Sequence, residues 1–274
     1  MADNRPSLAI VIVTFNSRGE IQGCLDSLVG HTEPFPATIT VVDNASTDGT
    51  AAFIRERWPS VKVIDGGGNL GFSRANNIGI RASKSDYVLL MNPDTVAPPG
   101  GIQTLVRGLA AYGAAAVAGP RLLNDRNFPE LSWGPTISPL GELTQKVLAT
   151  LYHRKVRRVV RYVDRLSRQS REVAWVSGAC MVIRRPDLEA VGLLDERFFL
   201  YTEDVDLCVS MAKRDRRILY VASAEIMHAR GRSAARNPDT EQMRRKSQIA
   251  YYEKHHPAWV PLLRLYLKLK GRPT

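Results

Sequence analysis

The chain has 274 residues, of which 44% are hydrophobic and 24% are charged. This length and composition are those of a folded chain with a sizeable core, and they argue against an intrinsically disordered protein. Lysine and arginine number 38 against 27 aspartate and glutamate residues, so the formal net charge is +11, which favours phosphate-rich partners: nucleotides, nucleic acid or an anionic membrane surface.

The first hundred residues alternate between short apolar runs and segments with helical spacing. Strands are predicted at Leu8–Val13, Thr38–Val42, Val61–Ile64 and Tyr87–Met91, and helices at Arg18–Val29, Thr50–Trp58 and Ser73–Ala82. Ser46 or Thr47 is expected to cap the second of these helices. Such alternation, with a continuous β-branched first run, is typical of a parallel sheet covered by helices.

The later part of the chain is more basic. A strand is predicted at Trp175–Ile183, a loop at Leu194–Tyr201, a helix at Asp204–Arg214 and a short strand at Arg217–Val221. The last forty residues are expected to be helical, with breaks at Pro257 and Pro261. We expect one domain at 1–235, with a first half to about 119, a second half at about 120–235 and a basic insert at about 152–171, followed by a basic helical tail at 236–274.

No stretch approaches the roughly 20 apolar residues of a membrane-spanning helix, and the run from Leu8 to Val13 is too short for a signal peptide. Cys24, Cys180 and Cys208 are far apart and show no C-x-x-C spacing, which favours free thiols in a reducing compartment. We therefore expect a protein that is kept in the cytoplasm.

Polar side chains gather where the first four predicted strands end. The clusters are Thr14-Phe15-Asn16, Asp43-Asn44, Asn69 to Phe72 and Asn92-Pro93-Asp94. Turns favour the same residue types, so one cluster alone would mean little. Because the carboxyl ends of parallel strands meet at one edge, where such sheets bind ligands, the four together predict a ligand cleft.

Six segments occur in the order that is typical of one enzyme family. They are Ile12–Ser17 (IVTFNS), Val41–Gly49 (VVDNASTDG), Asn69–Ser73 (NLGFS), Leu90–Asp94 (LMNPD), Trp175–Ala179 (WVSGA) and Phe198–Asp206 (FFLYTEDVD). From about Ser7 to Arg232 the chain resembles the family 2 inverting glycosyltransferases, especially their rhamnosyltransferase-like branch. The resemblance implies a GT-A fold, with a single mainly parallel or mixed sheet flanked by helices, a Rossmann-like nucleotide half and an acceptor half. It also implies transfer of a sugar from a nucleotide diphosphate, with dTDP-rhamnose or a UDP-sugar as the expected donor.

The resemblance assigns the nucleotide sugar to the first four strand ends. Thr14 and Asn16 would line the base pocket, and Asp43 would accept a hydrogen bond from the pyrimidine ring. Arg74 would lie along the diphosphate, whose oxygens match the guanidinium fork. The implied site comprises Thr14, Phe15, Asn16, Asp43, Asn44, Asn69, Gly71, Phe72, Arg74 and Asn92.

A divalent cation, Mn²⁺ or Mg²⁺, is expected at Asp94. Asn92 and Asp94 resemble the D-x-D signature of GT-A enzymes, although the first acid is replaced by asparagine. His228 matches the position of a late histidine that completes the metal site in many such enzymes, and imidazole is a suitable ligand. A lone histidine can equally be structural, and Arg230 or Arg232 could meet the diphosphate instead.

The acids Glu203, Asp204 and Asp206 lie within four residues of one another. The resemblance makes Asp204 the general base that takes the proton from the acceptor hydroxyl, with Glu203 as the reserve candidate. Asp204 could alternatively be a helix N-cap. The acceptor side is expected at Trp175, Ser177 and Gly178, where Trp175 either stacks on a sugar or belongs to the core.

Other classes fit less well. A dinucleotide-binding oxidoreductase would carry G-x-G-x-x-G after the first strand, and a nucleotidyltransferase would carry a glycine-rich basic signature there, whereas this chain has neither. Nucleic-acid binding is disfavoured because the basic insert has few aromatic residues and no recognisable module. Arginines interleaved with valines suit a helix on anionic lipid with its apolar face among the headgroups. We therefore expect peripheral binding at the inner face of the membrane and a lipid-linked or cell-surface glycan intermediate as acceptor.

Overall fold

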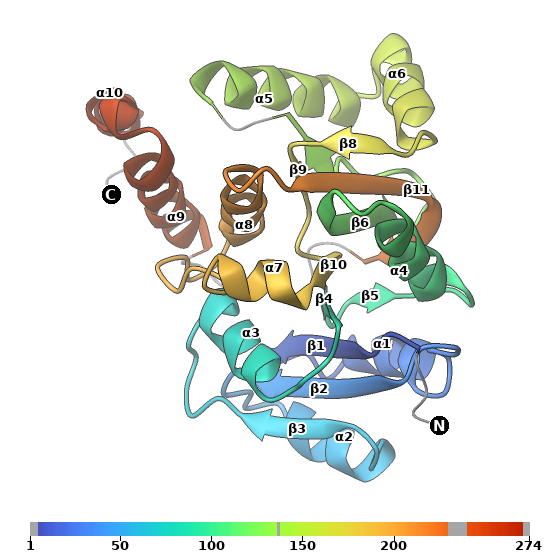
Figure 1. Ribbon diagram of the computed structural model, residues 1–274. Coiled ribbons are helices and arrows are strands. Elements are labelled where there is room, and N and C mark those ends of the chain that lie inside the picture. The colour runs from blue at the N-terminus through green and yellow to red at the C-terminus, as the bar shows by residue number, and fades with distance from the viewer. Residues whose placement is uncertain (1–4, 136–137, 230–239, 271–274) are drawn as a thin grey trace.

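The computed structural model describes residues 5–135, 138–229 and 240–270. Most strands in these ranges join one nine-stranded sheet, with helices on both of its faces (Figure 1). The strands are β1 (Leu8–Thr14), β2 (Ala37–Asp43), β3 (Lys62–Asp65), β4 (Tyr87–Met91), β5 (Thr95–Val96), β6 (Ala115–Leu123), β7 (Trp133–Gly134), β8 (Arg171–Val173), β9 (Trp175–Val176), β10 (Cys180–Arg184) and β11 (Arg217–His228). The helices are α1 (Ile21–Leu28), α2 (Thr50–Arg57), α3 (Phe72–Arg81), α4 (Gly101–Ala111), α5 (Pro139–His153), α6 (Arg157–Ser167), α7 (Arg185–Ala190), α8 (Glu203–Ala212), α9 (Thr240–His255), the 3₁₀ helix η2 (Pro257–Trp259) and α10 (Val260–Leu269).

The sheet is mixed, and its first half is parallel. The strand order is β3-β2-β1-β4-β10-β6-β11-β5, and β8 pairs with β11 beside this path. β1 is buried along its whole length and pairs in parallel with β2 and β4, as its continuous β-branched run predicts. β10 lies antiparallel between β4 and β6, and β11 runs parallel to β6. The predicted sheet flanked by helices is confirmed.

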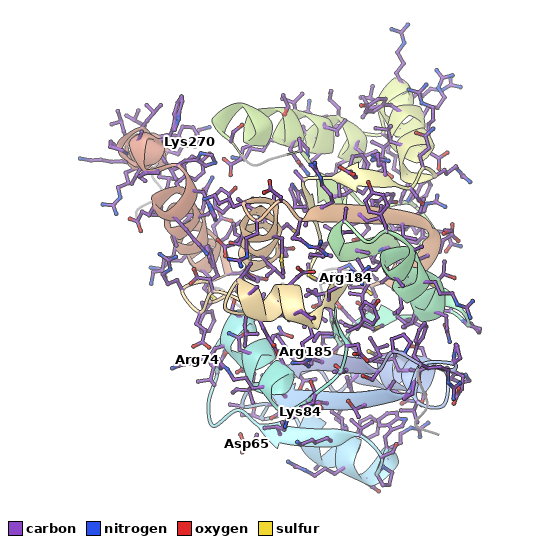
Figure 2. The ribbon with its side chains drawn as sticks, viewed as in Figure 1. Asp65, Arg74, Lys84, Arg184, Arg185 and Lys270 are labelled. Carbon is purple, nitrogen blue, oxygen red and sulfur yellow. The ribbon has the colours of Figure 1, made fainter. Side chains whose placement is uncertain are left out.

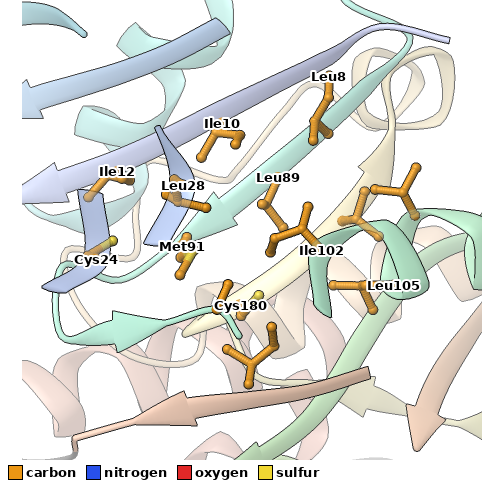
Figure 3. Close-up of a cluster of buried hydrophobic side chains, with 14 of the residues drawn as sticks. Leu8, Ile10, Ile12, Cys24, Leu28, Leu89, Met91, Ile102, Leu105 and Cys180 are labelled. Atoms are coloured by element: carbon orange, nitrogen blue, oxygen red, sulfur yellow. The ribbon is translucent and has the colours of Figure 1, made fainter. Parts of the chain in front are cut away.

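Both faces of the sheet are covered. On one face, α1, α2 and α4 pack against β1 and β4, and Figure 3 shows Ile10 and Leu89 of these strands in one cluster with Leu28 and Ile102 of the helices. On the other face, α3, α7 and α8 pack against side chains that alternate with the first set. The carboxyl ends of β1, β2 and β4 form an edge that these helices leave available to a ligand.

The C-terminal helices are tied to α8. Phe198 and Val205 form a buried cluster with Tyr251 and Tyr252 of α9, and α10 joins this cluster. Asp206 of α8 is buried beside α9, accepting a hydrogen bond from Lys254 Nζ at 2.8 Å and pairing with His255 Nε2 at 2.7 Å. These contacts make α9 a packing partner of the helix that carries the acid cluster.

The prediction of one strand at Trp175–Ile183 is wrong. β9 and β10 are separated at residues 177–179, where the Gly178 amide donates to the Asp204 carboxylate instead of to a neighbouring strand. The predicted caps of α2 are also wrong, because the N-cap residue is Gly49 and the Thr50 amide donates to Asp48 at 3.1 Å. Ser46 and Thr47 bind the loop after β1 instead, through hydrogen bonds with Asn16.

Two further elements differ from their predictions. β11 continues to His228, seven residues beyond the predicted end at Val221, because its later half pairs with β6 and β5. Helix α6 does not present its valines to solvent: Val163 is buried, and Val159 and Val160 are half-buried. These valines therefore do not form the expected free apolar face for lipid headgroups, and the exposed side of α6 consists mainly of arginines together with Tyr162, which is 46% exposed.

The three cysteines are free thiols, as predicted, and all are buried. Pro257 starts η2 between α9 and α10, which confirms the predicted break there. The predicted break at Pro261 is wrong, because Pro261 lies in the first turn of α10, where the missing amide hydrogen costs no helical hydrogen bond. No helix in the described ranges is both long and apolar enough to cross a membrane.

Candidate active site

The ends of β1 and β2 bring Thr14 and Asp43 together. The two residues are partners in the parallel ladder, and Thr14 Oγ1 donates to Asp43 Oδ1 at 2.9 Å. The Ser46 amide donates to the other Asp43 oxygen at 3.0 Å. Asn16 has a φ of 52°, and its side-chain oxygen accepts from the Thr47 amide at 2.8 Å. Phe15, between Thr14 and Asn16, is the most solvent-exposed residue of this predicted base pocket.

Asn44 holds the glycine-rich loop after β3 against the end of β2. Its side chain donates to Asn69 Oδ1 at 2.9 Å and accepts from the Leu70 amide at 2.8 Å. This loop leads into Gly71 and Phe72 at the start of α3, and the Phe72 amide donates to the Phe199 carbonyl at 2.6 Å. The loop of the predicted nucleotide half is thereby joined to the loop that precedes α8.

Gly71 cannot carry a side chain in this junction. Its φ is +80°, and a Cβ there would lie 2.5 Å from the Phe199 carbonyl oxygen. We expect Gly71→Ala to lower the free energy of unfolding by about 1–3 kcal/mol, because it adds backbone strain and a clash. Urea denaturation checks this, with Gly68→Ala as control, since a Cβ at Gly68 would meet nothing within 4 Å. Equal stability of the two variants would contradict the close contact.

Arg74 is placed at the surface of α3. Its Nε lies 3.3 Å from Glu196 Oε2, and Figure 2 shows the side chain at the outside of the molecule. Glu196 also accepts from Asn77 and Arg81, and these hydrogen bonds hold its pKa below the usual range. The structure thus pairs Arg74 with an acid, and its predicted contact with the diphosphate stays a prediction.

Asp94 and His228 come together through β-pairing. Asp94 precedes β5, whose Thr95 is the partner of His228 in β11, and His228 Nε2 lies 3.4 Å from Asp94 Oδ1. Both side chains are buried, and Asp94 Oδ1 has no hydrogen-bond partner within the described ranges. A carboxylate and an imidazole are suitable ligands for a divalent cation of the manganese type. Arg230 and Arg232, the alternatives to His228, lie outside the described residues.

The other ring nitrogen of His228 contacts Glu130, a residue that the sequence analysis missed. His228 Nδ1 and Glu130 Oε2 are 3.1 Å apart, and the Glu130 carboxylate is buried. Burial opposes charge on the imidazole, but the carboxylates of Asp94 and Glu130 outweigh it and raise the pKa of His228 to about 9. Glu130 lies in no recognisable motif, so only its position after β6 could have drawn attention to it. No group of three or more His, Cys, Asp or Glu side chains arranged for a metal is found in the described ranges.

Asp204 lies in the first turn of α8, held by two backbone amides. Gly178 N donates to Asp204 Oδ2 at 2.9 Å, and Val205 N donates to Oδ1 at 2.8 Å. Tyr201 and Thr202, just before the helix, have φ values of 69° and 72°. The N-cap position belongs to Thr202, so the alternative reading of Asp204 as the N-cap is wrong.

The environment of this acid pair suits a base. Burial raises the pKa of Asp204, and burial together with the Asp204 charge raises that of Glu203 well above the usual range. Glu203 is the more buried of the two, and its Oε2 has no hydrogen-bond partner in the described part of the chain. Carboxyl groups with raised pKa values are common at catalytic sites.

Gly178 and Ala179 connect the loop that carries Asp94 with the start of α8. The Asn92 amide donates to the Ala179 carbonyl at 2.9 Å, and Thr95 Oγ1 contacts the same oxygen at 3.3 Å. One residue earlier, Gly178 binds Asp204, and a Cβ on Gly178 would lie 3.7 Å from the Phe72 ring. The break between β9 and β10 therefore links the Asp94 loop, α3 and α8 at one edge of the sheet.

Trp175 and Ser177 are built into the framework beside this edge. The Trp175 indole donates to the Pro135 carbonyl at 3.0 Å, and its half-buried ring packs against the cores around α8. The Ser177 amide donates to the Ser132 carbonyl at 2.8 Å. A separate cavity of about 840 Å³ lies between α5, α6 and the end of α8, and none of the predicted site residues line it.

Comparison with known proteins identifies the family. The family described as "Glycosyl transferase family 2" matches residues 9–192. The chain is 32% identical to the N-acetylglucosaminyl-diphospho-decaprenol L-rhamnosyltransferase of Mycobacterium tuberculosis, over 92% of this chain and 86% of that protein. It is 25% identical to the rhamnosyltransferase WbbL of Escherichia coli, over 80% of this chain and 82% of that protein.

Solved structures share the fold. The mannosyltransferase PcManGT from Pyrobaculum calidifontis, in complex with GDP-Man and Mn²⁺, superposes with a TM-score of 0.62 at 17% identity, covering 96% of this chain and 69% of that one. TarS of S. aureus in complex with UDP gives a TM-score of 0.58 at 14% identity, covering 90% of this chain and 65% of that one. These similarities confirm the predicted GT-A fold. The chain belongs to glycosyl transferase family 2, in its rhamnosyltransferase branch.

Proposed function

We propose that the enzyme transfers rhamnose from dTDP-rhamnose to a hydroxyl group of a lipid-linked glycan intermediate. The observation that carries the reaction is the half-buried Asp204 carboxylate, held by the Gly178 amide beside the loop of Asp94. The sugar and the acceptor are supported by the name of the Mycobacterium tuberculosis relative, which covers most of both chains. A UDP-sugar is the second candidate donor, because one structural neighbour is a complex with UDP.

The proposed reaction is a single displacement. The acceptor oxygen forms a bond to the anomeric carbon as the bond between that carbon and the diphosphate oxygen breaks, and the configuration inverts. Asp204 accepts the acceptor proton, for which its raised pKa is suited. Asp43 and Thr14 hold the base, while the Asn44-bound loop and Gly71 lie beside the ribose and diphosphate.

A divalent cation is proposed at Asp94 and His228. The fit is good, because the Asp94 Oδ1 atom is buried without a hydrogen bond and faces His228 Nε2. When bound, the cation would neutralise negative charge on the leaving diphosphate. The protein would supply two ligands, Asp94 and His228, and oxygen atoms of the donor diphosphate would complete the coordination of the cation.

Glu130 is expected to orient His228 for this site. A carboxylate that accepts from the distal nitrogen of a ligating histidine fixes its tautomer and ring direction. We expect Glu130→Gln to weaken Mn²⁺ binding by about 10–100-fold, measured by calorimetry in the presence of dTDP. Glu189→Gln is the matched control, since Glu189 is exposed and pairs with Arg185 on α7. Unchanged Mn²⁺ affinity in the Glu130 variant would mean that this carboxylate plays no part in metal binding.

The enzyme is also proposed to work at an anionic membrane surface. The exposed arginines of α6 and its flanks support this, because each basic residue near such a surface contributes about 1 kcal/mol of binding. They are Arg154, Arg157, Arg158, Arg161, Arg165 and Arg168. Placement at the inner, cytoplasmic face follows if the donor is a cytoplasmic nucleotide sugar.

A thermal-shift screen followed by a transfer assay tests the proposed donor. We expect dTDP-rhamnose with Mn²⁺ or Mg²⁺ to raise the melting temperature more than UDP- or GDP-sugars do, because a bound ligand stabilises the folded state by mass action. Rhamnose should then be transferred to an N-acetylglucosaminyl-diphospholipid. If only a UDP-sugar stabilises the protein and is turned over, the protein is still a glycosyltransferase, but its donor is a UDP-sugar and not dTDP-rhamnose.

A further inference from the structure

Helix α10 carries an apolar stripe that nothing in the described structure covers. Leu262, Leu265, Tyr266 and Leu269 recur at i, i+3, i+4 and i+7, so they share one face of the helix. Their exposed fractions are 55%, 52%, 46% and 78%, and Trp259, one turn earlier, is 45% exposed. The opposite face is used for packing, because Leu263 and Leu267 are buried in the cluster shared with α9.

The stripe is set in basic surroundings. From Val260 to Lys270 the chain contains Arg264, Lys268 and Lys270 and no acidic residue. Arg264 is held by Glu253 of α9 at 2.9 Å, whereas Lys268 is exposed and Lys270 Nζ lies 5.7 Å from the centre of the Tyr266 ring. Figure 2 shows Lys270 at the outer end of the molecule. Exposed leucines and aromatics between cations are the composition of a helix that lies in a membrane interface.

We propose that α10 docks this enzyme on an anionic membrane, with its Leu262–Leu269 stripe among the acyl chains and its lysines at the lipid headgroups. The helix has 10 residues, too few to span a bilayer, so it lies in the plane of the surface. A second copy of the chain is a less suitable partner for this stripe than a membrane. Two α10 helices packed face to face would bring Lys268 and Lys270 of both copies together, and these like charges repel. This proposal depends on the proposed function in one respect, namely that the acceptor is held in a membrane.

The docking helix is connected to the candidate base. α10 packs on α9, and α9 is joined to α8 by the contacts of Lys254 and His255 with Asp206, at 2.8 Å and 2.7 Å. Asp206 lies two residues from Asp204 on the same helix. The surface that binds α10 therefore sets the position of Asp204 relative to an acceptor held in that membrane.

The two membrane-facing elements have different roles. α6 and α10 both lie toward the same end of the molecule, the upper one in Figure 1, with β3 and α2 at the other. In α6, Val163 is buried and Val159 and Val160 are half-buried, so α6 supplies mainly positive charge. α10 supplies the apolar surface, and its removal should leave a weak, salt-sensitive attachment.

Co-sedimentation with vesicles tests the proposal, using phosphatidylcholine with and without about 30% phosphatidylglycerol. The full chain should bind the anionic vesicles, and the double variant Leu265→Asp/Leu269→Asp should reduce the partition coefficient by at least about tenfold, since two apolar anchors become charged. The matched control is Ala52→Asp/Ser60→Asp, which adds two carboxylates at exposed positions in and after α2. The control should bind as the wild type does, and equal circular dichroism and melting temperatures should show that all three proteins fold.

Transfer assays separate this proposal from the proposed function. The α10 double variant should keep wild-type turnover on a short water-soluble acceptor and lose at least about tenfold on the same acceptor anchored in vesicles. Equal vesicle binding by the variant and the wild type would overturn the proposal, and so would a change from dimer to monomer in light scattering without loss of vesicle binding. Absence of rhamnose transfer by the wild type would refute the proposed donor while leaving the vesicle result intact.

Discussion

Replacing Asp204 with asparagine is expected to lower the turnover number by about 10²–10⁴-fold, the usual effect of losing a general base. The amide has nearly the shape of the carboxylate, and its oxygen can still accept the hydrogen bond from Gly178, so the fold should be retained. Donor binding should change little, because the base takes its proton from the acceptor. Steady-state rates, together with a separate measurement of nucleotide affinity, would show that turnover is lost while donor binding is kept.

The reserve candidate provides the comparison. Glu203→Gln should cost far less than Asp204→Asn if Asp204 is the base, and the reverse order would assign the role to Glu203. The pH dependence adds a second test. Because burial raises the pKa of Asp204, the base is protonated and the rate falls as pH drops through a value above that of an ordinary aspartate. A rate that stays constant through the weakly acid range would exclude a carboxylate with this raised pKa.

Replacing Asp94 with alanine is expected to remove both metal-supported donor binding and transfer, with a loss in kcat/KM of at least about 100-fold. The carboxylate faces His228 in a buried pair, and within the described ranges Asp94 is the acid that pairs with the Nε2 atom of this histidine. Calorimetry of dTDP binding with and without Mn²⁺ measures the effect directly. The strengthening by Mn²⁺ should disappear in the variant.

A matched control separates metal binding from net charge. Asp125→Ala removes one carboxylate from an exposed turn and should leave the Mn²⁺ effect unchanged. If Mn²⁺ strengthens dTDP binding equally in the Asp94 variant and the wild type, Asp94 is not a ligand. Loss of dTDP binding in the absence of metal would instead assign Asp94 to the nucleotide itself.

Local pattern was enough for the nucleotide half of the fold. The first four strands and three helices lie within a few residues of their predicted positions, because each is bounded by turn residues and has the periodicity of its type. Where pairing with distant residues decides an element, the pattern was not enough. β11 extends to His228 because β5 and β6 supply partners, and Trp175–Ile183 is interrupted because Asp204, 26 residues away from Gly178, takes the Gly178 amide.

By itself, the sequence determined the fold class, the family and the candidate acids, since motif order and hydrophobic periodicity are local properties of the chain. Only the tertiary structure decided what surrounds them. Glu130 contacts His228 although the two residues are 98 positions apart, and Asp206 binds α9 rather than joining the two candidate bases. Burial is likewise a property of the packed molecule: Val163 of α6 is buried and the leucines of the α10 stripe are exposed, although both helices have apolar residues at helical spacing. The physical reason is that contacts between distant segments depend on how the helices and the sheet pack together. No local sequence pattern encodes that packing.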